Sequence, residues 1–182
     1  MIDTKQIEQR LLLQSALLML LVAVSGTVTG VLTGSAAVLL DGIASFIAVI
    51  IKIMMIITSK LIARETSKRF QFGYWQFEPL VLLLEGGFTL LFVIYGLMTG
   101  VMDLLGSGNA VKVGPVVFYA LFFTLADGLY YVYVNRVNAR LKSNLVKFDN
   151  ISWSVDAVLA GGILMGTSAS SIASSSVPVR LY

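Results

Sequence analysis

The stretch that decides the fold is "AVLLDGIASFIAVIIKIM", residues 37–54, which is almost entirely apolar but contains Asp41 and Lys52. An ionisable side chain within a membrane-spanning helix costs about 2.5–3.5 kcal/mol on insertion scales, and such a residue is therefore a functional candidate by default. The alternative is the core helix of a soluble protein, whose two charges reach water at its ends. The composition of the whole chain decides between these two interpretations.

Composition places the chain in a membrane. Hydrophobic residues make up 57% of the 182 residues and charged residues only 13%, whereas an average soluble domain has about 25% charged residues. A chain with so few charges cannot cover a water-facing surface, and we expect the lipid bilayer to surround it. The net charge of +3 is small and scattered, which gives no support to nucleic-acid binding.

The residue types that are missing limit the chemistry. The chain has no cysteine and no histidine, which excludes disulfides, thiolate catalysis and imidazole ligands or bases. A bound metal must therefore be held by oxygen atoms, and a proton must be carried by a carboxylate or a lysine. No phosphate-binding loop, nucleophile elbow or dinucleotide fingerprint is present, so we expect neither an enzyme nor an organic cofactor.

Apolar stretches of about 20 residues are needed to cross a bilayer as helices. The chain has such stretches at residues 11–32, 36–58, 79–102, 113–134 and 148–167. We therefore predict an all-α fold, a multi-span helical membrane bundle with five helices over residues 11–166. A polar N-terminus, residues 1–10, precedes it, and a serine-rich segment, residues 167–182, follows as a truncated or disordered tail.

The loops predict the orientation in the membrane. Segments 59–78 and 135–147 are rich in Lys and Arg, while the links near 33–35 and 103–112 are nearly uncharged. Basic short loops stay on the cytoplasmic side. We therefore expect a multi-pass protein of the bacterial inner (plasma) membrane with a cytoplasmic N-terminus.

Glycines recur at four-residue spacing in or next to three of the predicted helices. Such spacing lets helix backbones pack closely in lipid, and we predict close helix packing there rather than glycine hinges for gating. The residues are Gly26, Gly30 and Gly34, then Gly96 and Gly100, then Gly162 and Gly166.

Two helices each combine a carboxylate with a hydroxyl on one face. Asp41 and Ser45 are four residues apart, as are Ser152 and Asp156, and this spacing puts each pair on one side of its helix. Together they could enclose a cation with oxygen ligands, which suit Mn²⁺, Mg²⁺ or Fe²⁺ better than soft metals. The alternative is that the serines bond back to helix carbonyls and the aspartates face a water-filled crevice.

Three motifs carry a family resemblance: "GSAAVLLDGIASF" at 34–46, "RFQFGYWQFE" at 69–78 and "DNISWSVD" at 149–156. In this order and spacing they resemble the second-helix, third-helix and fifth-helix motifs of the cation diffusion facilitator family of metal–proton antiporters. The resemblance covers roughly residues 10–166. Gln76 departs from it, because the family signature has Lys or Arg at that position.

The resemblance implies a fold of six spans, of which five are present here, followed by a cytoplasmic metal-sensing domain that this chain lacks. It implies a metal site at Asp41, Ser45, Ser152 and Asp156, with serine at two positions where the family has Asp or His. It also implies a homodimer that exports a divalent metal cation (Mn, Fe, Zn or similar) in exchange for protons. Two carboxylates and two hydroxyls should bind Zn²⁺ weakly, since zinc prefers nitrogen and sulfur ligands.

Three further charges, Lys52, Glu85 and Asp127, lie at a similar depth from the cytoplasmic ends of their predicted helices. Buried charges must compensate one another, so we predict an accessory cluster in which Lys52 pairs with Glu85 or Asp127. The cluster would serve as an inner gate or proton path, or would fix helix rotation. The alternative for Lys52 is that its amine extends to the interface along its own stem.

Two other functions stay open. A proton-coupled exporter of small organic cations would need an aromatic cavity, which Tyr130, Tyr131 and Tyr133 could line, although tyrosines also gather at membrane interfaces. The chain could also be an inactive, truncated transporter fragment.

Overall fold

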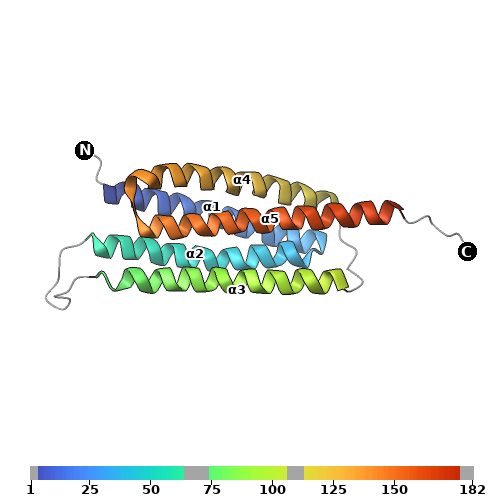
Figure 1. The fold of residues 1–182 in the computed structure, drawn as a ribbon, viewed down its shortest axis with the longest axis horizontal. Coiled ribbons are helices and arrows are strands. Elements are labelled where there is room, and N and C mark those ends of the chain that lie inside the picture. The colour runs from blue at the N-terminus through green and yellow to red at the C-terminus, as the bar shows by residue number, and fades with distance from the viewer. Residues whose placement is uncertain (1–3, 64–73, 106–112, 177–182) are drawn as a thin grey trace, which may run out of the picture.

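The protein is a bundle of long helices (Figure 1), seen in a computed structural model that describes residues 4–63, 74–105 and 113–176. The helices are α1 (Thr4–Thr33), α2 (Ala36–Ile62), α3 (Phe77–Leu105), α4 (Val113–Leu141) and α5 (Asn144–Ser176). Over the described residues no strand is present. The prediction of an all-α helical membrane bundle is confirmed.

Four of the helices, α1 to α4, are long and apolar enough to cross a membrane. α5 is also long, since its 33 residues correspond to about 50 Å at 1.5 Å per residue. Its first half is less apolar than the other helices, because it carries Asp149, Asn150, Ser152 and Asp156. The sequence predicted five spans, and the structure contains five long helices.

The helices extend beyond the apolar stretches that predict them. α5 begins at Asn144, before the predicted start at residue 148, and continues to Ser176, within the segment 167–182 expected to be a tail. Polar residues at helix ends are compatible with helix but reduce local hydropathy, which explains the shorter predicted spans. Residues 177–182 and the first half of the 69–78 motif, residues 69–73, lie outside the described residues.

α1 and α2 form a tight hairpin. Gly34 ends α1 with a φ of +74°, a left-handed conformation that glycine adopts at little cost, and its N–H donates to Gly30 O at 2.9 Å. Ser35 then caps α2, because its hydroxyl accepts a hydrogen bond from the Val38 N–H at 3.4 Å.

The two backbones of this hairpin touch at glycines. A Cβ atom added to Gly42 would lie 2.3 Å from the Thr27 backbone nitrogen, and one added to Gly30 would lie 2.4 Å from the Leu39 backbone nitrogen. Close helix packing is therefore confirmed at Gly30, and also at Gly26, whose added Cβ would lie 2.9 Å from Gly42 Cα. It is not found at Gly162, which has open space around it.

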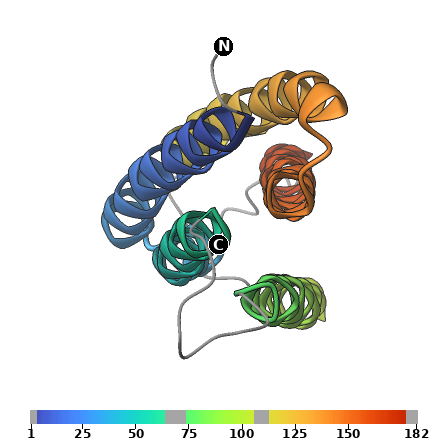
Figure 2. The same ribbon diagram turned by 90° about the vertical axis from the view of Figure 1, so that its left-hand side faces the viewer.

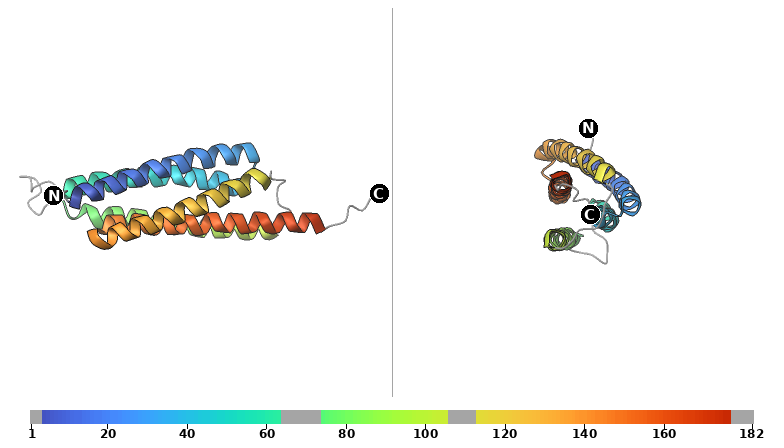
Figure 3. Two further views of the ribbon diagram at one scale, coloured as in Figure 1. Left: turned by 90° about the horizontal axis from the view of Figure 1, so that it is seen from above. Right: turned by 90° about the vertical axis from the view of Figure 1, so that its right-hand side faces the viewer.

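α4 and α5 form the second hairpin, and α3 lies at the edge of the bundle against α2 and α5. The end-on view shows α1 and α4 on the side opposite α3 (Figure 2), and the second end-on view agrees (Figure 3). The core lies between the two hairpins, where side chains such as Leu12, Met55 and Val146 are buried together.

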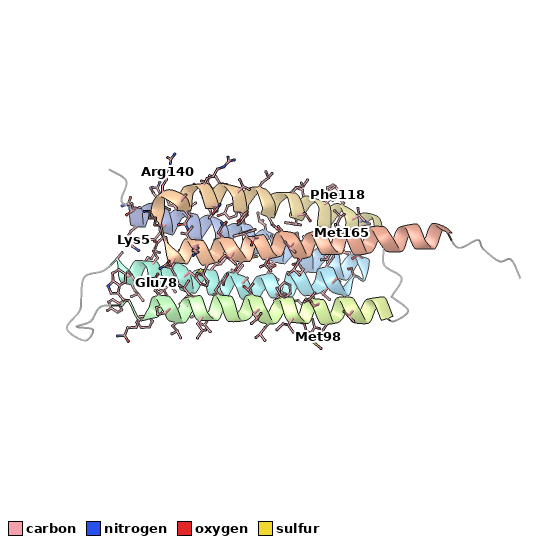
Figure 4. The ribbon with its side chains drawn as sticks, in the orientation of Figure 1. Lys5, Glu78, Met98, Phe118, Arg140 and Met165 are labelled. Atoms are coloured by element: carbon pink, nitrogen blue, oxygen red, sulfur yellow. The ribbon has the colours of Figure 1, made fainter. Side chains whose placement is uncertain are left out.

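The charged residues mark one end of the bundle, which we call the charged end. Lys5, Glu78 and Arg140 lie there, whereas Met98, Phe118 and Met165 lie toward the other half (Figure 4). The start of α1, the end of α2, the start of α3 and the α4–α5 turn all lie at the charged end (Figure 1). Segments 59–78 and 135–147, which are predicted to lie on the same side of the membrane, therefore both begin and end at the charged end.

Candidate functional site

Lys52 is fully buried, with 0% of its surface exposed, and its amine forms an ion pair with Asp149 on α5. The same Asp149 oxygen accepts a hydrogen bond from the Ser15 hydroxyl at 2.8 Å. The Trp153 indole N–H donates to Ser15 at 2.8 Å, and its ring centroid lies 5.3 Å from the Lys52 amine, within cation–π range. These four residues, the ion-pair network, connect α1, α2 and α5.

The prediction that Lys52 pairs with Glu85 or Asp127 is wrong. Neither Glu85 nor Asp127 forms an ion pair with it among the described residues, although both are buried and close enough to interact with it electrostatically. Because α5 begins at Asn144 rather than at residue 148, Asp149 lies inside the bundle, where the long lysine stem reaches it. The alternative of an amine at the interface is also wrong, because the side chain is enclosed by protein.

Glu85, on α3, is held by Ser152 on α5. Its Oε1 accepts a hydrogen bond from the Ser152 hydroxyl at 2.5 Å, and the Thr89 hydroxyl lies 3.4 Å from the same serine oxygen. Glu85 is 2% exposed, and its Oε2 has no hydrogen-bond partner among the described residues. Ser152 therefore links α5 to the edge helix.

Asp41, on α2, is held from α4. The Tyr119 hydroxyl donates to Asp41 Oδ2 at 2.8 Å, and the ring of Tyr119 is buried against Phe123, with 4.6 Å between centroids. Ser45 donates to the Asp41 backbone oxygen at 2.8 Å, as in the alternative in which the serines bond back to their own helix. Sequence reasoning missed Tyr119, although it lies four residues before Phe123 and eight before Asp127, a spacing that puts all three on one helix face.

Asp156, on α5, is half-buried and close enough to Asp41, Asp127 and Lys52 to interact with all of them electrostatically. The two aspartates of the predicted site, one on α2 and one on α5, are thus within electrostatic range of each other. Within the described part of the chain, no three acidic side chains gather closely enough to form a metal site by themselves. The arrangement is a carboxylate pair with Asp127 as a further acidic neighbour.

This carboxylate pair offers only oxygen atoms as ligands. Buried carboxylates are stable when a cation or protons neutralise them, and a cation and protons compete for the same oxygens. Lipid-facing apolar side chains cover the outside of the bundle, for example Leu83, Leu129 and Val158. The carboxylate pair therefore lies inside a scaffold whose outer surface is apolar.

The comparison with protein families gives one result that spans most of the chain. The family model of the cation efflux transmembrane domain matches residues 12–177. Neither the comparison with curated proteins nor that with solved structures found a match. The resemblance to the cation diffusion facilitators is thereby confirmed: the chain belongs to the cation efflux family and is a multi-pass membrane transporter of cations.

Proposed function

We propose that this protein exports divalent metal cations from the cytoplasm in exchange for protons, and that Asp41 and Asp156 bind the transported ion. The observation that supports the proposal is that these two carboxylates, one on α2 and one on α5, lie within electrostatic range of each other. Ser45 and Ser152 would add hydroxyl oxygens once they leave their present partners, the Asp41 carbonyl and Glu85.

The exchange of a cation for protons follows from the negative charge of the carboxylate pair. Two carboxylates that are close together and shielded from water cannot both stay ionised at low cost. A divalent cation neutralises them on one side of the membrane, and protons replace it on the other. Protons entering the cell would then drive the cation out as the site alternates between the two sides.

The ligand set favours a hard ion over a soft or organic one. With carboxylate and hydroxyl oxygens alone, Mn²⁺ or Fe²⁺ suits the site better than Zn²⁺. The tyrosines that an organic-cation cavity would need are used elsewhere: Tyr130 packs edge-on against Trp153, with 4.7 Å between ring centroids, and donates to Leu11 O at 3.3 Å. Tyr133 is 50% exposed.

Reconstitution of the purified protein in liposomes tests this proposal. With an acidic lumen, we expect Mn²⁺ and Fe²⁺ to accumulate inside faster than Zn²⁺, and we expect a proton-exchanging ionophore to abolish the accumulation. A metal-sensitive dye in the lumen measures the rate. Uptake of a fluorescent organic cation with no metal uptake would favour the organic-cation exporter, and no uptake of either would favour an inactive fragment.

We also propose that the protein is a homodimer, as the resemblance implies, and that the charged end faces the cytoplasm. A single cysteine can test the orientation cleanly, because the chain has none of its own. Arg140→Cys at the charged end should react with an impermeant maleimide only after cells are opened. Gly114→Cys, at the opposite end of α4 where an added side chain has open space, should react in intact cells. The reverse pattern would contradict the proposed orientation.

A further inference from the structure

The amine of Lys52 is a positive charge fixed inside a mostly acidic interior. Among the described residues, Lys52 is the one basic side chain that is buried. Glu85, Asp127 and Asp149 are buried carboxylates. Its ion pair with Asp149, its contact with the Trp153 ring and its complete burial hold the amine in place. The charge cannot leave the interior while the bundle is folded.

This charge also acts on the proposed transport site. Lys52 interacts electrostatically with Asp156 and Asp127 as well as with its partner. It is eleven residues from Asp41 on the same helix, about 16 Å along the axis. Charges at such distances still interact inside a protein, where the effective dielectric constant is well below that of water.

We propose that Lys52 is an affinity-determining residue: its fixed charge competes with the transported cation for the carboxylates, and Asp149 sets how much of that charge the site experiences. The inference rests on the proposed function. Lys52 is not a ligand and acts only through the acidic groups around the cation. Its effect is to weaken cation binding.

Weak binding is useful for a transporter. A transported ion must bind well enough to enter and weakly enough to leave. Asp41 and Asp156, with Asp127 nearby, would hold a divalent cation more firmly if nothing opposed its charge. A lysine that cannot leave provides that opposition in every transport cycle.

A purely structural role makes a different prediction. If the pair only ties α2 to α5, removing either partner leaves an unpaired buried charge and loosens the bundle. Both single substitutions would then weaken cation binding. Competition by charge instead predicts that the two substitutions change the cation dissociation constant in opposite directions. Lys52→Met removes the charge that repels the cation, whereas Asp149→Asn leaves that charge without its neutralising partner.

The test measures the Mn²⁺ dissociation constant of the purified full chain at one fixed pH. We expect Lys52→Met to tighten binding about tenfold and Asp149→Asn to weaken it about tenfold. The double variant Lys52→Met/Asp149→Asn should return to within about threefold of the original protein. Lys60→Met, on the exposed surface of the same helix, is the matched control and should leave the constant unchanged.

Folding can be checked in the same samples. The chain has two tryptophans, so Trp75→Phe leaves Trp153 as the reporter, and its emission should stay typical of a buried indole. If Lys52→Met does not fold, Asp149→Asn is compared with the double variant instead. The inference then requires that the double variant binds Mn²⁺ more tightly than Asp149→Asn, because it lacks the charge of Lys52.

Equal weakening by both single substitutions, or no tightening of the double variant relative to Asp149→Asn, would overturn the inference. Failure of the proposed function is seen separately: the unmodified protein would then neither bind Mn²⁺ nor accumulate it under a pH gradient. That result would remove the basis for an affinity-determining lysine as well.

Discussion

Replacing Asp41 with asparagine is expected to reduce cation transport to the background of empty liposomes, a loss of at least about 100-fold. Asparagine keeps the size of the side chain and can still accept the hydrogen bond from Tyr119, but it removes one of the two negative charges that would neutralise a divalent cation. A buried cation without that charge is strongly disfavoured. Initial rates of Mn²⁺ uptake, measured at equal protein content, give the result.

Two comparisons make the Asp41→Asn result specific. Glu78→Gln removes a carboxylate at the charged end, where Glu78 accepts a hydrogen bond from Asn144 at 3.1 Å, and it should transport normally. Size-exclusion chromatography should show the same monodisperse peak for Asp41→Asn as for the original protein. If Asp41→Asn keeps more than half of the transport rate, Asp41 does not bind the transported ion.

The largest effect on stability is expected for Gly42→Ala. The new methyl group would lie 2.3 Å from the Thr27 backbone nitrogen and 2.7 Å from the Gly26 carbonyl carbon. Backbone atoms cannot rotate away as a flexible side chain would, so α1 and α2 must separate. We expect a loss of about 3 kcal/mol or more, at the upper end for overpacked sites, measured as a lower midpoint of thermal unfolding in detergent.

Gly128→Ala is the matched control on α4. An added Cβ there has nothing within 4 Å, and alanine favours helix over glycine by about 0.8–1.0 kcal/mol. The control should therefore unfold at the same or a slightly higher temperature. Equal destabilisation by both substitutions would show that loss of glycine, rather than contact between the two backbones, causes the effect.

The helices could be predicted from the sequence because hydropathy and helix length both follow from the thickness of the bilayer. Their ends could not, since a helix continues into polar residues that reduce the hydropathy of the window. The error at the start of α5 had a consequence: a helix starting at residue 148 puts Asp149 at the membrane surface, whereas a start at Asn144 puts it inside. Asp149 was therefore not predicted as the partner of Lys52.

The predicted site was only partly accessible to sequence reasoning. Spacing put Asp41 and Asp156 on defined helix faces, and the structure brings these two within electrostatic range. Spacing cannot say which acceptor a hydroxyl takes, and Ser152 donates to Glu85, a residue 67 positions away in the sequence. Contacts of this kind depend on how α3 and α5 pack, which no local pattern encodes.

The Lys52–Asp149 pair has a consequence for how the protein is made. Its partners are 97 residues apart in sequence, and chains are synthesised at about 5–20 residues per second. Lys52 is therefore synthesised about 5–20 s before Asp149. Until α5 is made, an unpaired amine at this position extends along its stem toward the nearer surface of the bilayer. Synthesis of α5 then draws it inward, so this lysine changes its surroundings once in the life of each molecule.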